Sequence, residues 1–538
     1  MTEETVAQIF SRAAARWRNH PFLHIANETA AAYAIASGSI SYGEAADAVE
    51  RLRALYRAAG YGPGERVGLM LENRPAFFLH WLALNGLGTS VVPLNPELRP
   101  RELDYLVAHS EIALAVGTDQ HVPVLRAAAA RTGRHFLVAA DDFDAVAAPA
   151  GPAARNDDGS ECALLYTSGT TGAPKGCILS NAYFLGCGRW YNAIGGLAQL
   201  EPGVERLLTP LPMVHMNAMA YSTMAMILAG GCIIPLDRFH PRSWWQSVRA
   251  SEATVVHYLG VMPSLLLAAE PDPSDRAHKV RFGFGAGVDR RHHAAFEARF
   301  GFPLLEGWAM TETGAGAVVF CNRAPRHVGT NCFGKPEPAV ETRLVDEAGQ
   351  DAAADQPGEL LVRAAGPDPG AGFFSRYLKD DAATAEAWRG GWFHTGDIVR
   401  RDGAGFLYFV DRRKNIIRRS GENISAVEVE SVLRRHPAVR EVAVAAAPDD
   451  LRGEEVLACV VPTAPVAPER RADTARAIVA LALAELAYFK APGWVAFLDE
   501  LPLTATQKIQ RGSLKELART LPGTECCVDT RPLKRRRS

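Results

Sequence analysis

The sequence predicts a protein of mixed α/β and α+β type: a large amino-terminal domain of parallel α/β subdomains plus a β region, and a small α+β domain at the carboxyl end. Two observations carry this prediction. Up to residue 287, short apolar runs alternate with amphipathic helical segments, which is typical of βαβ units and a parallel sheet. From about residue 340, short strands separated by Gly- and Asp-rich turns indicate antiparallel pairing.

The first third of the chain follows the first pattern. After an amphipathic helix over residues 1–20, strands are expected at 65–71, 89–95 and 111–117, where apolar runs lie between turn residues. The alternation then resumes beyond residue 180. The remaining segments of this kind are helices at 73–88, at 99–110, from about Asn181 and at 241–250, with strands at 232–236, 254–260 and 280–287.

The stretch Leu207–Leu236 contains no acidic or basic side chain and is long enough to span a bilayer. Prolines, His215, Asn217 and the Gly230–Gly231 pair interrupt it, however. We therefore expect a buried helix, a Gly-Gly stop and a short strand within the protein core, and no transmembrane segment.

The second pattern gives way to a compact α+β region after residues 411–415. Strands are expected at 341–346, 358–364 and 405–411, before this boundary. We therefore place the large domain at residues 1–411 and the small one at 412–538. Within the small domain we expect helices at 425–437 and 471–487 and strands at 439–449, 455–463 and 493–502.

Composition excludes several classes of protein. Apolar content of 48% and charged content of 22% are ordinary for a globular protein, and a net charge of −2 gives no reason to expect nucleic-acid binding. Nine scattered cysteines without a C-x-x-C pair suit a reducing compartment, so we expect a cytoplasmic protein. The basic run 534–537 is expected to be solvated.

A loop at residues 164–181, LLYTSGTTGAPKGCILSN, has the residue types of a phosphate site. Glycines let the backbone approach closely, exposed N–H groups and hydroxyls donate hydrogen bonds, and Lys175 adds a positive charge. The spacing does not fit the G-x-x-x-x-G-K-[ST] loop, because Pro174 precedes the lysine and Gly176 follows it. Two interpretations of this loop therefore stay open: a phosphate loop of another class, or a solvated Ser/Thr/Gly turn.

Four further stretches complete a constellation: EGWAMTETG (306–314), GWFHTGD (391–397), DRRKNIIRRSGENIS (411–425) and LPLTATQKIQR (501–511). Together with the YTSGTTGAPKG loop, in this order, they resemble the adenylate-forming superfamily, in its acyl-CoA synthetase or AMP-dependent ligase branch. The resemblance implies a large AMP-binding domain and a small, mobile catalytic-lid domain. It also implies that a carboxylate attacks the α-phosphorus of MgATP to give an acyl-adenylate, from which coenzyme A then displaces AMP.

The resemblance assigns the nucleotide site residue by residue. The loop from Thr167 would hold the β- and γ-phosphates, the ring of Trp308 would pack on adenine, and Asp397 would bind the ribose hydroxyls. Thr311 would contact the α-phosphate, and Glu312 would ligate Mg²⁺, which prefers oxygen ligands. The remaining ATP- or AMP-binding residues would be Ser168, Gly169, Thr170, Thr171, Gly172, Lys175, Gly285, Ala286, Gly287, Glu306, Gly307, Met310 and Arg412.

Lys508 is the expected catalytic cation. Adenylation brings a carboxylate against the α-phosphate, and two like unit charges at 4 Å repel by about 1 kcal/mol in water and about 4 kcal/mol at an effective dielectric of 20. A lysine that bridges both groups offsets this repulsion in the transition state. On composition alone, Lys508 would simply be a surface lysine, and its distance from the other motifs favours the catalytic role.

The same resemblance implies that the small domain rotates about a hinge at Lys414 between the two half-reactions. The rotation would bring the turn Arg418, Arg419, Ser420 and Gly421 to coenzyme A. His215 matches a position beside the substrate carboxylate, although a satisfied core histidine is equally expected.

The leading function is therefore an acyl-CoA synthetase that uses ATP, Mg²⁺ and coenzyme A. The alternatives are an enzyme that loads a separate carrier protein, an inactive nucleotide-binding homologue and a luciferase-type oxygenase. The acid is expected to be aryl, alicyclic or medium-chain, because the segments near His215, 255–262 and 283–288 are mostly apolar. The oligomeric state is not fixed by the sequence, which is compatible with a homodimer.

Overall fold

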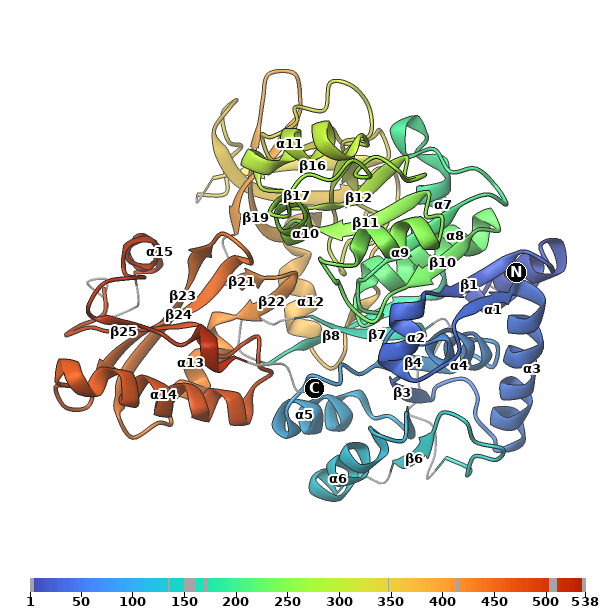
Figure 1. The fold of residues 1–538 in the computed structure, drawn as a ribbon, viewed down its shortest axis with the longest axis horizontal. Coiled ribbons are helices and arrows are strands. Elements are labelled where there is room, and N and C mark those ends of the chain that lie inside the picture. Colours follow the sequence, from blue (N-terminus) through green and yellow to red (C-terminus); the bar gives the residue numbers. More distant parts are fainter. Residues whose placement is uncertain are drawn as a thin grey trace. The chain divides into compact units, whose positions relative to one another are not determined.

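The computed structural model describes residues 4–133, 136–149, 161–167, 173–346, 348–412, 416–502 and 510–534 (Figure 1). The chain folds into two compact units. The larger comprises Met1–Pro96, Leu106–Tyr166 and Gly176–Asp411, and the smaller comprises Glu97–Tyr105, Thr167–Lys175 and Arg412–Ser538.

The first sheet of the larger unit is the α/β layer that the sequence predicts, with the strand order β18-β8-β7-β4-β3-β5-β6. Its edge strand β18 is antiparallel to β8. The pairs β3–β4, β3–β5, β5–β6 and β4–β7 are parallel. The strands are β3 (Arg66–Met70), β4 (Ser90–Pro93), β5 (Leu114–Gly117), β6 (Leu137–Ala140), β7 (Glu161–Thr167), β8 (Lys175–Ser180) and β18 (Arg376–Tyr377), and the helices that alternate with them are α3 (Tyr42–Ala58), α4 (Pro75–Asn85), α5 (Pro100–Ser110) and α6 (Val122–Thr132).

The second sheet has eight strands in the order β14-β13-β12-β11-β9-β10-β1-β2, and its strands from β1 to β13 in this order are parallel. These strands are β1 (Pro21–Ile25), β2 (Gly38–Ser41), β9 (Arg206–Thr209), β10 (Cys232–Pro235), β11 (Val255–Leu259), β12 (Phe282–Ala286), β13 (Leu304–Trp308) and β14 (Val319–Phe320). The strands predicted at 232–236, 254–260 and 280–287 are confirmed.

Helices cover both faces of the eight-stranded sheet. One apolar cluster joins α9 (Trp244–Ala250), α10 (Val261–Leu267) and α11 (Arg290–Phe300) to side chains such as Leu208 and Val256, and another joins α7 (Asn181–Ala193) and α8 (Thr223–Ala229) to their neighbours Leu207 and Val255. Successive strand residues point to opposite faces, so a strand covered on both sides reads as a continuous apolar run. The amino-terminal helices α1 (Val6–Arg16) and α2 (Asn27–Tyr33) belong to this unit as well.

The uncharged stretch 207–236 forms part of this core, as predicted. It contains β9 from its second residue onward, α8, a left-handed stop at Gly230 with φ 67°, and β10. The sequence did not indicate that the helix opens with a π-helical turn, η2 (Asn217–Ser222). Within the residues described, no helix has both the length and the apolar character needed to cross a bilayer.

The β region forms a five-stranded sheet in the order β15-β20-β19-β17-β16, and its registered pairs are antiparallel, as predicted. The strands are β15 (Cys332–Gly334), β16 (Val340–Val345), β17 (Pro357–Ala364), β19 (Phe393–Arg401) and β20 (Leu407–Arg412), and α12 (Asp381–Ala387) precedes β19.

The carboxyl-terminal part of the smaller unit is an α+β layer whose central strands alternate between two apolar faces. Val442 and Val444 pack in one cluster with α13 (Ala426–Leu433) and α14 (Pro468–Glu485), whereas Ala443 and Ala445 pack in the other with α15 (Arg511–Thr520). Figure 1 shows α14 and α15 on opposite sides of these strands. The strands are β21 (Ile416–Arg419), β22 (Glu422–Ser425), β23 (Val439–Asp449), β24 (Gly453–Pro462), β25 (Trp494–Phe497) and β26 (Cys527–Asp529).

The prediction of a solvated basic run is wrong for Lys534. Its side chain is 1% exposed, and its Nζ lies 2.6 Å from the Glu455 carboxylate, which also binds the buried guanidinium of Arg419 at 2.8 Å. Burial, and the positive charge of Arg419, lower the pKa of Lys534 to about 7. The preceding turn η4 (Arg531–Leu533) places the Arg531 guanidinium 4.3 Å from the centre of the Trp494 ring. Residues 535–537 lie outside the described part of the chain.

Candidate active site

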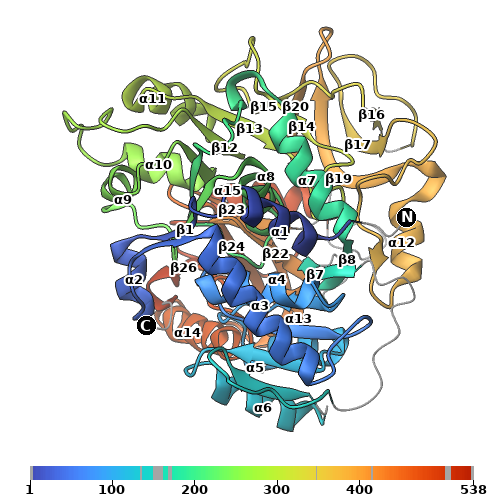
Figure 2. The same cartoon turned by 90° about the vertical axis from the view of Figure 1, so that its right-hand side faces the viewer.

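Several predicted site segments meet at one edge of the eight-stranded sheet. Strands β9, β11, β12 and β13 are parallel neighbours, so their carboxyl ends share an edge. Ligands of open α/β sheets bind in the crevice outside the carboxyl ends of the strands. The segments that follow these four strands carry His215, Gly260, Gly287 and the run from Trp308 to Glu312. Figure 2 shows two of these strands, β12 and β13, from a second direction.

Glu306 shapes the loop that follows β12. One carboxylate oxygen accepts hydrogen bonds from the Tyr258 hydroxyl at 3.0 Å and the Val288 N–H at 3.1 Å, and the other accepts from the Gly287 N–H at 3.0 Å. Burial raises the pKa of Glu306, and these donors and the charge of His293 oppose the rise. Glu306 was predicted to bind nucleotide, whereas here its carboxylate holds the loop expected to border the adenine.

Two glycines permit the close approach of this loop, and only Gly285 was predicted from the sequence. A Cβ on Gly285 would lie 2.3 Å from the Tyr258 carbonyl oxygen. A Cβ on Gly260 would lie 1.6 Å from the Gly287 carbonyl oxygen, a distance that no side chain tolerates. The backbone of the β11 end therefore packs directly against the loop, and only glycine fits at position 260.

Trp308 and Asp397 lie together, although they are 89 residues apart in the chain. The Trp308 Nε1–H donates a hydrogen bond to Asp397 Oδ2 at 2.9 Å. The two residues are 7% and 1% exposed, and they come from β13 and β19, strands of two different sheets of the larger unit. Thr395 Oγ1 accepts the Asp397 N–H at 3.0 Å. The ring that was expected to pack on adenine therefore also orients the carboxylate that was expected to bind ribose.

The Thr311–Glu312 turn is held from two sides. Tyr377 donates its hydroxyl to Glu312 Oε1 at 2.9 Å, and Tyr183 of α7 donates to the Thr311 carbonyl oxygen at 2.9 Å. Burial and the negative charge of Glu312 raise the pKa of Tyr377, so this hydroxyl stays protonated and serves as a donor. The Phe374 N–H adds a hydrogen bond to the Glu312 carbonyl oxygen at 2.9 Å. Neither tyrosine was anticipated from the sequence.

Glu312 suits Mg²⁺ better than a metal that needs several protein ligands. Among the residues described, no group of three or more His, Cys, Asp or Glu side chains is placed to hold a metal ion. Mg²⁺ is usually bound by one or two carboxylates together with substrate phosphates and water. A single carboxylate that is buried and held in one orientation, as Glu312 is, fits this donor set.

Other predicted residues are only partly covered by the structure. Thr167 ends β7 and Lys175 begins β8, while His215 lies half-buried before η2. For Arg412 the structure describes the backbone alone. The residues that lie outside the described ranges are Ser168, Gly169, Thr170, Thr171, Gly172, Lys414 and Lys508.

The predicted coenzyme A turn is the β21–β22 hairpin of the smaller unit. Ser420 is exposed in a left-handed conformation with φ 50°, and Gly421 follows with φ 91°. The Arg418 N–H donates to the Glu454 carboxylate at 2.6 Å. Arg419 differs from the expectation that it contacts coenzyme A, because its buried guanidinium is engaged with Glu455.

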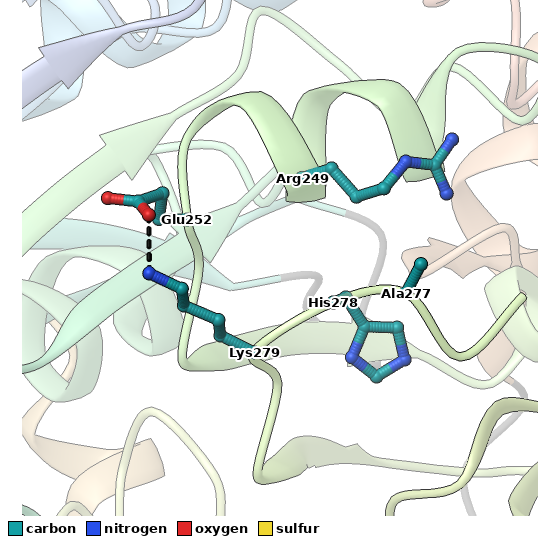
Figure 3. A pocket seen from close by; sticks show the side chains of 5 residues that line it. All are labelled: Arg249, Glu252, Ala277, His278 and Lys279. Atoms are coloured by element: carbon teal, nitrogen blue, oxygen red, sulfur yellow. Dashed lines mark hydrogen bonds and ion pairs between the residues drawn. The ribbon is translucent and has the colours of Figure 1, made fainter. Parts of the chain in front are cut away.

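A surface pocket on the larger unit lies away from these residues (Figure 3). Arg249 lies in α9 before β11, and Lys279 precedes β12, so the pocket is at the amino ends of the strands. An ion pair between Lys279 and Glu252 crosses it. Its lining residues are Arg249, Glu252, Ala277, His278 and Lys279, and none of them was predicted to be functional.

Comparison with known proteins agrees with this geometry. Residues 10–374 match the AMP-binding enzyme family, and residues 428–508 match the AMP-binding enzyme C-terminal domain. A crotonobetaine/carnitine–CoA ligase of Citrobacter koseri is 30% identical over 91% of this chain and 96% of its own. A sulfoacetate–CoA ligase of Cupriavidus necator is 31% identical over 94% of this chain and 97% of its own.

A solved amide bond synthetase from Marinactinospora thermotolerans has the same fold, with a TM-score of 0.78 and 24% identity over 94% of this chain and 99% of its own. The resemblance proposed from the sequence motifs is thus confirmed. The chain belongs to the AMP-binding enzyme family, and it is an ATP-dependent, AMP-forming acyl-CoA ligase that uses Mg²⁺ and coenzyme A.

Proposed function

We propose that the carboxyl edge of the eight-stranded sheet is where this ligase converts a carboxylic acid and ATP into an acyl-adenylate. The observation that carries the proposal is the hydrogen bond from Trp308 to Asp397, together with the turn at Glu312 on the same strand end. Trp308 and Glu312, at the end of β13, and Asp397, from the distant strand β19, are buried and hydrogen-bonded near one edge, where α/β sheets bind ligands.

In the proposed nucleotide site, Asp397 accepts hydrogen bonds from the ribose hydroxyls and Trp308 packs beside the adenine. The loop Gly285–Gly287 borders the base, and its backbone position is set by Glu306. The neutral indole orients this carboxylate without placing a positive charge beside it that would compete with the ribose hydroxyls. The phosphate groups are assigned to the loop from Thr167 to Lys175.

We assign Glu312 as the Mg²⁺ ligand and Thr311 as a contact of the α-phosphate. When bound, Mg²⁺ supplies positive charge that offsets the repulsion between the phosphates and the attacking carboxylate. Tyr377 keeps the Glu312 carboxylate in one orientation without neutralising it, because a protonated phenol donates a hydrogen bond but carries no charge.

Lys508 is proposed to bridge the carboxylate and the α-phosphate during adenylation. We place the domain boundary at residues 411 and 412, with residues 412–538 as the lid and Lys414 as its hinge. The hairpin from Arg418 to Gly421 is proposed to serve the second half-reaction, in which the thiol of coenzyme A attacks the acyl carbon and AMP leaves. Because its guanidinium is bound by Glu455, Arg419 is proposed to stabilise the hairpin backbone and not to contact coenzyme A itself.

A pyrophosphate-release assay over a panel of carboxylic acids, with and without coenzyme A, tests the proposal. We expect release that depends on one class of acid, and a Lys508→Ala variant slower by about 100-fold or more. Lys515 of α15, changed to alanine, is the matched control and should leave the rate unchanged. Equal rates for the Lys508→Ala variant and the unaltered enzyme would contradict the assignment.

Measurement of acyl-CoA formation in the same assay distinguishes coenzyme A from a carrier protein as the acceptor of the acyl group. The carrier-protein alternative predicts pyrophosphate release without any acyl-CoA product. The inactive-homologue alternative predicts nucleotide binding without pyrophosphate from any acid.

A further inference from the structure

A fully buried histidine lies beneath the same edge of the sheet and has no role in the chemistry described so far. His257 of β11 is 0% exposed, and its ring stacks on Phe284 of β12 with centroids 4.7 Å apart. Its Nε2 lies 3.1 Å from the Tyr191 hydroxyl, and its Nδ1 lies 2.7 Å from Asn217 Oδ1 and 3.0 Å from Ser222 Oγ. The four polar groups come from α7, η2 and β11.

The hydrogen-bond network allows one arrangement of protons. Tyr191 has no acceptor other than His257 Nε2 among the described residues, so its hydroxyl donates to Nε2. The Ser222 hydroxyl donates to the Asn217 backbone carbonyl at 3.1 Å. Nδ1 therefore carries the proton and donates to Asn217 Oδ1. Burial lowers the pKa of His257 to about 3, so the ring is neutral at pH 7 and keeps this tautomer.

This network fixes the carboxamide of Asn217. Because Oδ1 faces His257, the Asn217 NH₂ group points away from the buried cluster. Asn217 is half-buried, whereas His257, Tyr191 and Ser222 are buried, and within the described chain nothing accepts a hydrogen bond from its amide nitrogen. Asn217 also opens the π-helical turn, two residues after His215, and such turns occur often at functional sites.

The strand order shows which part of a substrate this NH₂ group would meet. The nucleotide residues Trp308 to Glu312 follow β13, and β11 is two strands away from β13. Neighbouring strands are about 4.8 Å apart, so the histidine that holds Asn217 lies roughly 10 Å from β13. A carboxylate that reacts beside Glu312 is thus several bonds away from the Asn217 NH₂ group.

Aromatic rings pack around the histidine that holds Asn217. Phe284 lies 4.8 Å from the Tyr191 ring centre and 5.8 Å from that of Tyr221, and Trp190 lies 5.5 Å from Tyr221. A long alkyl chain would have to displace this packed layer. A short acid would end near Asn217 instead.

We infer that Asn217 is a specificity-determining residue whose carboxamide donates a hydrogen bond to an oxygen acceptor on the acyl group, so that the substrate is a short acid bearing a hydroxyl, carbonyl or second acidic group. The inference rests on the proposed acyl-adenylate site. It replaces the expectation of an aryl, alicyclic or medium-chain acid without a polar group, because a hydrocarbon chain would leave a fixed donor without a partner. A site built for a hydrogen bond rejects analogues that lack the acceptor.

The test compares kcat/KM for pyrophosphate release with matched acids: butanoate against 3-hydroxybutanoate and succinate, and pentanoate against 4-oxopentanoate. We expect the unaltered enzyme to prefer at least one acceptor-bearing acid by about tenfold or more. An Asn217→Asp variant keeps the acceptor for His257 but loses the NH₂ donors, so it should lose that preference. Asn217→Leu should lose it as well, and the KM for ATP should change less than about twofold in both variants.

Two results would overturn the inference in different ways. An active enzyme whose acid preference is absent, or is unchanged in Asn217→Asp, would refute the role of Asn217 and leave the proposed adenylation site intact. An unaltered enzyme that releases pyrophosphate with none of these acids, nor with any other acid of the wider panel, would refute the proposed site and the inference together.

Discussion

The edge of the eight-stranded sheet and the hairpin of the smaller unit hold their polar groups by different means. At the sheet edge, Glu306, Glu312 and Asp397 each accept a hydrogen bond from a neutral donor, namely a tyrosine hydroxyl, a backbone amide or an indole N–H. In the smaller unit, the Glu455 carboxylate holds the basic groups of Arg419 and Lys534 in ion pairs.

This difference has a physical consequence. A neutral donor orients a carboxylate and leaves its charge available for a cation or a hydroxyl group. An ion pair between buried groups cancels charge and, if one partner is removed, leaves the other uncompensated at a cost of about 3–5 kcal/mol. The first arrangement suits groups that act on a ligand, and the second suits groups that brace a backbone turn.

Removal of the negative charge from Glu312 should have the largest effect. Glu312→Gln keeps the size of the side chain and an oxygen that can accept from Tyr377, but it loses the charge that attracts Mg²⁺. We expect the rate of pyrophosphate release to fall by about 100-fold or more. Single-turnover assays at saturating ATP and several Mg²⁺ concentrations would measure it.

Tyr377→Phe is the matched control for that change, because it removes the donor and keeps the charge. It should cost far less, about tenfold or under. If Glu312→Gln cost no more than Tyr377→Phe, the charge of Glu312 would not be what the reaction uses.

Loss of the indole N–H should have an intermediate effect. Trp308→Phe keeps an aromatic ring at this position but removes the donor to Asp397, and we expect the KM for ATP to rise about tenfold with a smaller change in kcat. If the effect passes through the ribose contact, it should shrink when 3′-deoxy-ATP or 2′-deoxy-ATP replaces ATP, because coupled changes are not additive.

An equal effect of Trp308→Phe on ATP and on both deoxynucleotides would show that the indole acts only through packing. Trp308→Tyr offers a further comparison, since its ring also carries a hydroxyl donor at a different position.

Removal of the Lys534 amine, which braces the smaller unit, should have the smallest effect on adenylation. Lys534→Met should leave acid-dependent pyrophosphate release within about twofold, while Arg419 and Glu455 keep their own ion pair. Thermal unfolding of the smaller unit and the rate of acyl-CoA formation are the measurements that should respond. A large loss of pyrophosphate release would contradict the division between the two regions.

The same variant has a predictable pH dependence. The pKa of Lys534 is about 7 in the folded protein, well below the value of an unfolded lysine, about 10.4. Between these values the unfolded chain binds more protons, so this lysine makes stability rise with pH across that window. Lys534→Met should remove this part of the slope of unfolding free energy against pH. An identical slope in both proteins would show that Lys534 titrates normally.

Local patterns in the sequence were sufficient for most of the fold. Alternating apolar runs and helical segments predicted the parallel sheets, the turn-rich region predicted the antiparallel one, and the apolar run of β23 follows from a strand covered on both faces. Candidate residues of the site could also be predicted, since Trp308, Glu312 and Asp397 lie in recognisable sequence motifs. These features depend on neighbours within a few residues in the chain.

Side-chain partners, in contrast, were decided by the tertiary structure. The sequence offered no signal for the hydrogen bond from Trp308 to Asp397, for the inward turn of Glu306, or for the π-helical turn that presents Asn217. It also placed Lys534 in solvent, whereas in the structure Lys534 is buried and bound to the carboxylate of Glu455, 79 residues away. The periodicity of apolar residues follows from the local geometry of helices and strands, so it can be seen in the sequence. The position of a buried charge or hydrogen-bond donor depends instead on a partner that is distant in the chain, because the group needs that partner once water is excluded.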